Sequence, residues 1–211
     1  MGMKIAREGY PLILAAAALT VLAFVLGGKL AGIVLVIVTL GVTAFFRDPD
    51  RVIPTGEGLV VSPADGRVVS IVNLEADSTS GDAATRVSIF LSPMDVHINR
   101  IPVTGNVEEV IYKRGKFMAA YKDEASSRNE QNTVKLDDDG GRKLQVIQVA
   151  GVVARRIVCR VHQGQGVQRG ERFGMIMFGS RTDTYLPRNC KIEVAEGQRV
   201  KGGETILARF V

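Results

Sequence analysis

A hydrophobic segment from Gly9 to Phe46 limits the folds open to this chain more than any other feature, because its only charged residue is Lys29. Two apolar runs make it up, residues 9–28 and residues 30–46. A helix needs roughly 20 apolar residues to cross a bilayer, within a range of about 17 to 25. The first run reaches this length and the second lies at its lower limit. The link Gly27-Gly28-Lys29 is short enough to turn a helical hairpin.

Three interpretations of this segment compete. A cleaved signal peptide is disfavoured because no small-x-small site precedes a polar start, and a second apolar run follows at once. A buried hairpin in a soluble core is disfavoured because helices that are apolar on all sides rarely suit so small a domain. We favour an N-terminal α-helical membrane hairpin over residues 1–47, either spanning the bilayer or lying in one leaflet. Its ends are flanked by Lys4, Arg7, Arg47 and Arg51, and the positive-inside rule then places the following domain on the cytoplasmic side of the cell membrane.

Composition narrows the function of the rest of the chain. The 211 residues carry a net charge of +5, and no basic tract accompanies this small excess, so no nucleic-acid partner is expected. A mild positive charge suits an anionic membrane surface. Only two cysteines, Cys159 and Cys190, and two histidines, His97 and His162, are present, which disfavours a disulfide framework and predicts no metal site.

A β-rich domain is predicted for residues 48–211, after the break at Asp48-Pro49. Short β-branched runs bounded by glycine favour strands. These runs are residues 58–62, 66–74, 86–92, 106–113, 133–137, 143–150, 154–161, 172–179, 190–195 and 205–210. One weak helix is expected over residues 119–130. The fold class is therefore mostly antiparallel β.

A weak internal repeat lies near the C-terminus. The segments VHQGQGVQRGERFGMIM (161–177) and VAEGQRVKGGETILARF (194–210) share Val, Gly, Gln, Val, Gly and Glu at matched positions. Two-sheet lipoyl- and biotinyl-type modules use this pattern at turns, where glycine supplies a positive φ. Duplication of a hairpin without any function explains the repeat equally well, and no carrier-type lysine tripeptide is present.

The segment FGSRTDTYLP (178–187) carries the chemistry. Taken alone, Gly179-Ser180 marks a strand that ends at a turn. Glycine before serine also leaves the Gly179 carbonyl open to attack by the neighbouring hydroxyl, because glycine has no Cβ. Such an attack needs a base and hydrogen-bond donors for the oxyanion.

Together with SPADGRVV (62–69) and SPMDVHINRIPVTG (92–105), this segment closely resembles the short type of phosphatidylserine decarboxylase proenzymes. The motifs occur in the family's order, and the resemblance covers residues 47–211. It implies a self-processing carboxy-lyase that needs a pyruvoyl group and makes phosphatidylethanolamine from a membrane phospholipid. Ser180 attacks the Gly179 carbonyl, and the chain divides into a β chain ending at Gly179 and an α chain of residues 180–211. These chains stay together as a heterodimer, and higher homo-oligomers remain open. The former Ser180 becomes the pyruvoyl ketone, which condenses with the substrate amine and accepts electrons as CO₂ leaves.

The resemblance also assigns roles to two further residues. Asp65 matches the family's acidic residue for self-cleavage, although a turn-capping aspartate explains the same residue. His97 matches the histidine of the decarboxylation step, where an imidazole that titrates near neutrality suits protonation of a carbanion. A structural histidine at a strand end is the alternative.

The chain departs from the long-type family pattern at Arg100, which stands where those members carry a second histidine. Arginine is no base near neutral pH. The group that deprotonates Ser180 therefore stays open: Asp65 acts alone, His97 serves both steps, or His162 takes part. Arg100 is instead expected to bind the phosphate or carboxylate of the substrate through its planar guanidinium.

Two other functions remain as alternatives. A decarboxylase for an archaeal-type serine phospholipid has the same reacting centre, so the motifs fit it equally. A non-catalytic, membrane-tethered lipoyl-like β module would leave the chain uncut. An ordinary serine hydrolase is disfavoured because the G-x-S-x-G motif is absent around Ser180.

Overall fold

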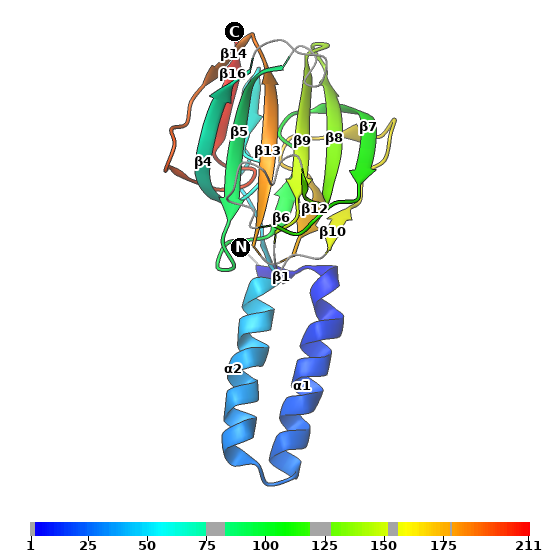
Figure 1. Cartoon of the computed structure of the whole chain (residues 1–211), viewed down its shortest axis with the longest axis vertical. Coiled ribbons are helices and arrows are strands. Elements are labelled where there is room, and N and C mark those ends of the chain that lie inside the picture. Colours follow the sequence, from blue (N-terminus) through cyan, green and yellow to red (C-terminus); the bar gives the residue numbers. More distant parts are fainter. Residues whose placement is uncertain (1–2, 75–82, 119–127, 152–155, 178) are drawn as a thin grey trace. The chain divides into compact units, whose positions relative to one another are not determined.

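A computed structural model of the chain describes residues 3–74, 83–118, 128–151, 156–177 and 179–211 (Figure 1). The chain divides into two compact units, Met1–Asp50 and Arg51–Val211. The first unit is helical and the second consists of strands. The predicted fold class, antiparallel β with N-terminal helices, is confirmed.

The N-terminal unit is an antiparallel pair of helices, α1 (Tyr10–Val25) and α2 (Lys29–Phe45) (Figure 1). A short 3-10 turn, η1 (Arg7–Gly9), leads into α1, and strands β1 (Met3–Ile5) and β2 (Arg47–Pro49) pair beside it. Gly27 turns the chain between the helices with a φ of 79°, a conformation that glycine adopts at no steric cost.

The helices contact each other through small and hydroxyl residues. The hydroxyls of Thr20 and Thr39 lie 3.1 Å apart, and each also donates to the carbonyl four residues earlier. Most large apolar side chains of both helices are exposed. Among the described residues, one helical segment, Arg7–Val25, is long and apolar enough to cross a membrane, whereas Lys29–Phe45 is a shorter apolar helix.

The second unit is built on an antiparallel sheet that has eight strands in the described part of the chain. In spatial order these are β11 (Gly166–Val167), β7 (Gly105–Lys113), β8 (Gln131–Asp138), β9 (Lys143–Val149), β13 (Ser180–Pro187), β5 (Ala83–Leu91), β4 (Gly66–Asn73) and β15 (Arg199–Val200). Buried and half-buried residues alternate along β8, as expected when one face of a strand covers a core. Strands β9, β13 and β5 occupy the middle of the sheet (Figure 1).

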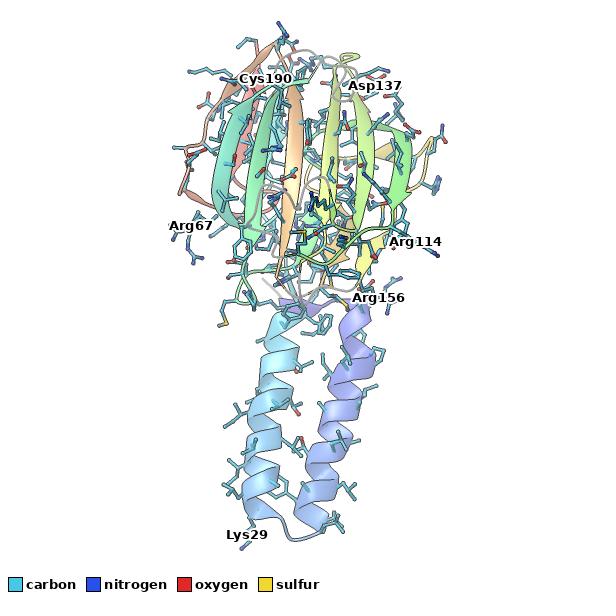
Figure 2. The ribbon with its side chains drawn as sticks, viewed as in Figure 1. Lys29, Arg67, Arg114, Asp137, Arg156 and Cys190 are labelled. Atoms are coloured by element: carbon cyan, nitrogen blue, oxygen red, sulfur yellow. The ribbon has the colours of Figure 1, made fainter. Side chains whose placement is uncertain are left out.

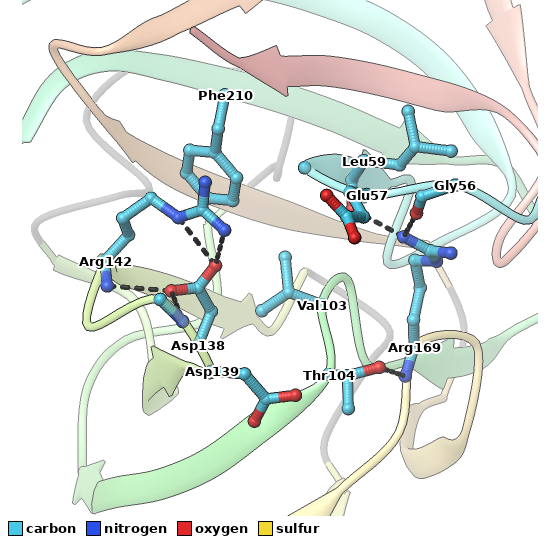
Figure 3. Close-up of a pocket in the computed structure, with 12 residues that line it drawn as sticks. Gly56, Glu57, Leu59, Val103, Thr104, Asp138, Asp139, Arg142, Arg169 and Phe210 are labelled. Carbon is cyan, nitrogen blue, oxygen red and sulfur yellow. Dashed lines mark hydrogen bonds and ion pairs between the residues drawn. The ribbon is translucent and has the colours of Figure 1, made fainter.

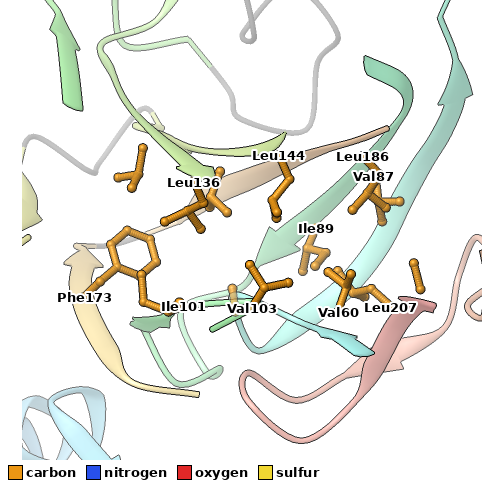
Figure 4. Close-up of a cluster of buried hydrophobic side chains, with 14 of the residues drawn as sticks. Val60, Val87, Ile89, Ile101, Val103, Leu136, Leu144, Phe173, Leu186 and Leu207 are labelled. Carbon is orange, nitrogen blue, oxygen red and sulfur yellow. The ribbon is translucent and has the colours of Figure 1, made fainter. Parts of the chain in front are cut away.

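Two smaller sheets cover one face of the large sheet. They contain β10 (Ile157–Cys159), β12 (Arg172–Ile176) and β6 (Ile98–Arg100), and β14 (Cys190–Ile192), β16 (Ile206–Phe210) and β3 (Leu59–Val61). The apolar core between the layers joins Phe173 and Leu207 of the small sheets to Ile89 and Leu136 of the large one (Figure 4). Burial of this continuous cluster supplies the main stabilising free energy of the unit.

The two copies of the internal repeat make equivalent contacts with the large sheet. Gly164 donates its amide to the Val107 carbonyl, and Gly197, its counterpart in the second copy, donates to the Val68 carbonyl. Gly170 and Gly203 form the second matched pair, with φ values of 81° and 79°. Strand β11 accordingly pairs with β7 at one edge of the large sheet, and β15 pairs with β4 at the other. The unit thus has two equivalent ends.

The main error of the sequence-based prediction concerns β13. The sequence predicts no strand over residues 180–187, yet β13 pairs with both β5 and β9. The strand carries Arg181, Asp183 and several hydroxyl residues, so its composition hides a buried strand. The predicted strand over residues 172–179 ends earlier, at Ile176. Of the predicted helix over residues 119–130, residues 119–127 lie outside the described part, as do residues 154 and 155 of another predicted strand.

Candidate active site

Ser180 is the first residue of the central strand β13 and lies where the strands of the large sheet end on one side. Its side chain is fully buried, and its Oγ finds no hydrogen-bond partner among the described residues. Gly179, directly before it, has a φ of 64°, and nothing in the described chain lies within 4 Å of the point where a Cβ would stand. The left-handed backbone favours glycine, and the space around it leaves the Gly179–Ser180 peptide bond accessible.

Asp65 lies at the same end of the strands as Ser180. Phe90 of β5 is the Cα partner of Arg67 in β4 on one side and of Arg181 in β13 on the other. Asp65 and Gly179 stand two residues before these partners, separated by two strand spacings, or roughly 10 Å. The strand register therefore brings the predicted acid and the predicted cleavage bond to the same end of the strands.

The Asp65 carboxylate is held by two neighbours. Arg51 donates to both of its oxygens, at 3.0 and 2.8 Å, and the amide of Gly202 donates to Oδ1 at 2.8 Å. Burial raises the pKa of Asp65 above its ordinary value, although the charge of Arg51 and these hydrogen bonds oppose the rise. Asp65 is thus a more basic carboxylate than an exposed aspartate.

His97 is fully buried beside the strand that leads to Ser180. The amide of Ile176, four residues before Ser180, donates to the His97 carbonyl, and the Nδ1 atom of His97 lies 2.9 Å from the Asp95 carbonyl. Because successive side chains of a strand alternate, Asn99 and Arg100 project to opposite faces of β6. Asn99 bonds to Gln148 on the inner face of the large sheet, the face that also carries Ser180.

The structure buries the Arg100 side chain against the backbone near the Asp65 turn and places His162 away from this group. The Arg100 guanidinium is buried and donates to the carbonyl of Gly170 at 2.9 Å. His162 is exposed in the turn before β11, and its Nδ1 lies 3.1 Å from the Gln163 carbonyl. Since β11 pairs with the first residues of β7, His162 lies at the opposite end of the sheet from Ser180. The Arg100 substrate contact remains a prediction, and its buried surroundings favour a structural role.

The inner face that carries Ser180 also carries buried polar side chains to which the sequence gave no role. Asn132 donates to Gln148 at 3.0 Å, and Gln148 donates to Asn99 at 2.9 Å. Thr182, two residues after Ser180, is the Cα partner of Gln148. All four side chains are buried. Asn99 and Thr182 lie within two of the motifs, but the motifs give no sign that these side chains approach Gln148, because that proximity depends on strand pairing and on the packing of the two layers.

Exposed arginines border the end of the large sheet at which Ser180 lies. Arg67 is the second residue of β4, Arg114 follows β7, and the carbonyl of Arg156 accepts from the amide of Met177 (Figure 2). Such a basic rim attracts anionic headgroups. Among the described residues, no group of three or more His, Cys, Asp or Glu side chains could hold a metal ion.

A cavity of about 520 Å³ lies at the other end of the sheet (Figure 3). Arg142 stacks 4.0 Å above the Phe210 ring there and forms an ion pair with Asp138. Arg169 donates to backbone carbonyls on the opposite wall. These side chains bind one another and the backbone, so they stabilise this end of the fold. None of the predicted site residues lines the cavity.

Comparison with known proteins decides the family. The family model described as "Phosphatidylserine decarboxylase" matches residues 38–208. The chain belongs to the phosphatidylserine decarboxylase family. It is 45% identical to the phosphatidylserine decarboxylase proenzyme of Wolbachia sp. subsp. Brugia malayi (strain TRS), over 98% of this chain and 91% of that protein. It is 47% identical to the proenzyme of the same name from Symbiobacterium thermophilum, over 98% of this chain and 95% of the relative.

A third phosphatidylserine decarboxylase proenzyme, from Geotalea uraniireducens (strain Rf4), is 45% identical over 96% of this chain and 95% of its own length. The similarity therefore includes the N-terminal helices as well as the β unit. The family resemblance predicted from the three motifs is confirmed, and with it the assignment of the chain to phospholipid biosynthesis as a carboxy-lyase proenzyme.

Proposed function

We propose that this decarboxylase matures by cutting its own Gly179–Ser180 bond and then converts phosphatidylserine into phosphatidylethanolamine and CO₂. One observation carries the cleavage proposal: a fully buried Ser180 hydroxyl without a partner among the described residues follows a left-handed Gly179. Leaving a buried hydroxyl unbonded costs about 1–3 kcal/mol. Thr182 and Thr184 carry hydroxyls in the same state, and Ser180 differs from them by the left-handed glycine directly before it.

In the first step, the Ser180 Oγ bonds to the Gly179 carbonyl carbon, the peptide C–N bond breaks, and the hydroxyl proton passes to the Ser180 nitrogen. Loss of the Ser180 Cα proton then expels the Gly179 carboxylate and leaves a dehydroalanine at position 180. Water hydrolyses its tautomer and releases ammonia. The products are a β chain that ends at Gly179 and an α chain that begins at residue 180, which we propose remain associated because β13 pairs with β5 and β9.

The residues around position 180 fit a pyruvoyl group. The Ser180 side chain is buried, its hydroxyl has no partner among the described residues, and the space beside Gly179 is open in the described chain. A pyruvoyl group supplies an electrophilic carbonyl that takes up electrons as CO₂ leaves. The chain would hold it through the β13 backbone.

We assign two proton-transfer roles to the chain. Asp65, with its raised pKa, accepts a proton during self-cleavage, and Arg51 and Gly202 fix its orientation. His97 gives a proton to the substrate carbon after CO₂ has left, because neutral-range titration suits an imidazole to this task. Burial of His97 keeps bulk water from competing for that position.

We further propose that helices α1 and α2 anchor the protein in the cell membrane, with the β unit on the cytoplasmic side. The exposed apolar side chains of both helices support anchoring in the membrane. The basic residues that flank the two helices favour the cytoplasmic side. The exposed arginines at the end of the sheet near Ser180 favour an anionic lipid substrate. Protease digestion of inverted and right-side-out vesicles distinguishes the two sides.

The decisive experiment is the intact mass of the purified chain under denaturing conditions. Two fragments, residues 1–179 and residues 180–211, are expected from the boundary at Gly179, and the smaller should lack a free amino terminus. Ser180→Ala is the control and should give one chain of full length. A wild-type chain that stays whole and releases no CO₂ from phosphatidylserine would overturn the proposal.

A further inference from the structure

Three amide side chains form a buried row against the face of the large sheet that also carries Ser180. Asn132 of β8 donates its Nδ2 to the Gln148 Oε1 at 3.0 Å, and the Gln148 Nε2 donates to the Asn99 Oδ1 at 2.9 Å. The Gln148 Nε2 also donates to the Val158 carbonyl at 3.1 Å. Both hydrogens of the Gln148 amide are therefore used, and its orientation is fixed.

The backbone makes room for this row at Gly174. A Cβ on Gly174 would stand 2.8 Å from the Gln148 Nε2 and closer still to the Val158 carbonyl. Any larger residue at position 174 would push the Gln148 amide away from Asn99. A glycine in the middle of a strand lowers the stability of the fold. Its presence at position 174 therefore indicates that the position of the Gln148 amide matters.

The row leaves one donor unused. Because the Asn99 Oδ1 faces Gln148, its Nδ2 is directed elsewhere, and this buried atom meets no hydrogen-bond acceptor in the part of the chain that is described. The hydroxyls of Ser180 and Thr182 are likewise buried and lack partners there. Thr182 is the cross-strand partner of Gln148, which places their Cβ atoms roughly 5 Å apart. Ser180 is the next residue on the same face.

Self-cleavage creates an acceptor at this point. When the Ser180 Oγ bonds to the Gly179 carbonyl carbon, the carbonyl oxygen becomes an oxyanion. Its charge must be stabilised by fixed donors, and asparagine side chains serve as such donors in other acyl-transfer sites. A donor that bonded the Ser180 Oγ instead would withdraw electron density from the nucleophile. The oxyanion is therefore the better partner for the unused Asn99 Nδ2.

We propose that Asn99 is a catalytic residue of the self-cleavage step, whose Nδ2 donates to the oxyanion formed at Gly179. Gln148 and Asn132 are positioning residues that hold the Asn99 amide in the donating orientation. This inference rests on the proposed self-cleavage. It assigns to these amides a function that the three sequence motifs do not contain.

The test follows cleavage of the full-length, detergent-solubilised chain by intact mass after synthesis. Asn99→Asp keeps the shape of the side chain and removes the donor, so cleavage should slow by about 10²–10³-fold. Gln148→Glu cannot donate to Asn99 and should slow cleavage by a smaller factor. Thr184→Val is the matched control, because Thr184 is a buried residue on the same face of β13, and its cleavage should keep the wild-type rate.

Two readouts separate catalysis from mere structure. Lowering the pH protonates the new carboxyl of Asn99→Asp and restores a donor, so its cleavage rate relative to wild type should rise as the pH falls. Hydroxylamine cuts esters but spares amides under mild conditions. The uncut Asn99→Asp chain should therefore resist hydroxylamine, because the ester does not form.

Each result decides the inference. Cleavage of Asn99→Asp at the wild-type rate, or an uncut chain that hydroxylamine cuts, overturns it while the proposed function stands. An uncut wild-type chain overturns the proposed function and this inference with it. If the melting temperature shows that Asn99→Asp does not fold, Gln148→Glu decides: slowed cleavage supports the role of Asn99, and unchanged cleavage excludes it.

Discussion

Asp65 and Thr104 occupy equivalent turns at opposite ends of the β unit. The amide of Gly202 donates to the Asp65 carboxylate at 2.8 Å, and the amide of Arg169, its counterpart in the first copy of the repeat, donates to the Thr104 hydroxyl at 3.2 Å. A glycine directly follows both Asp65 and Thr104. Capping the turn therefore requires only an oxygen acceptor, which a hydroxyl supplies. The negative charge of Asp65 is additional to this structural role.

The equivalence gives a clean test of Asp65. Asp65→Thr should preserve the turn, because threonine caps the matching turn, and it should remove the carboxylate that we propose accepts a proton during cleavage. We expect an uncut chain whose free energy of unfolding falls by about 1–3 kcal/mol through loss of the charged hydrogen bonds to Arg51. Intact mass and thermal unfolding measure the two effects. Normal processing of this variant would make Asp65 a turn residue only.

His97 should separate the two chemical steps. His97→Ala removes the imidazole proposed to protonate the substrate carbon, while the Asp65 group remains. The chain should therefore be cut, whereas CO₂ release from phosphatidylserine should fall by about 10²–10⁴-fold, the usual contribution of a general acid. An uncut chain would instead assign His97 to self-cleavage, and normal CO₂ release would exclude it from both steps.

The sequence predicted the helices and most strands, but it did not predict the central strand β13. Apolar alternation identifies a strand that lies against a core. Arg181 and Asp183 break this pattern, yet both are buried and form an ion pair at 2.9 Å. A charged pair that is satisfied by its own strand cannot be recognised from composition, because pairing depends on the folded geometry.

The site was predictable only in part, for a related reason. Short motifs place Asp65, His97 and Ser180 because each motif is local. Asn132 and Gln148 meet through the pairing of β8 with β9, and Asn99 of β6 reaches Gln148 only because a small sheet packs on the large one. The repeat of glycines was visible in the sequence, whereas the equivalence of the two ends of the unit required the pairing of β11 with β7 and of β15 with β4.

Arg100 should act on stability more than on substrate affinity. Its guanidinium donates to the Gly170 carbonyl, and a Cβ on Gly203 would stand 2.8 Å from the Arg100 Cδ, so the side chain is closely packed. Arg100→Met should lower the free energy of unfolding by about 1–3 kcal/mol and leave the KM for phosphatidylserine unchanged. A raised KM at an unchanged melting temperature would support the substrate contact that the sequence predicted.

Gly179 should resist replacement because of its backbone. With a φ of 64°, an L-residue at this position costs about 1–2 kcal/mol, although nothing described lies where its Cβ would stand. Gly179→Ala should therefore fold and be cut slowly, since the peptide bond shifts out of line with the Ser180 hydroxyl. Intact mass against time measures the rate, and cleavage as fast as wild type would show that the left-handed backbone is not needed.

Asp138 should govern the acid stability of the end opposite Ser180. Its buried carboxylate accepts hydrogen bonds from Arg142 and Gly140. Burial tends to raise its pKa, but these bonds and the Arg142 charge outweigh that tendency and hold the pKa below the ordinary value of 3.8. The folded chain therefore keeps this carboxylate ionised after the unfolded chain has taken up a proton. Its stabilising contribution is complete above pH 3.8 and is lost as the pH falls through the lower, folded-state pKa.

Asp138→Asn should accordingly lower the free energy of unfolding at pH 7 by about 2 kcal/mol, or the melting temperature by roughly 4–8 °C for a chain of this size. It should also weaken the fall in melting temperature on acidification below the ordinary aspartate pKa. Far-UV circular dichroism is the suitable probe, because the chain contains no tryptophan. Asp139→Asn, an exposed neighbour with the same change in charge, is the control and should leave both quantities near wild type. Equal losses in the two variants would show that net charge, rather than the bond to Arg142, sets the acid stability of this end.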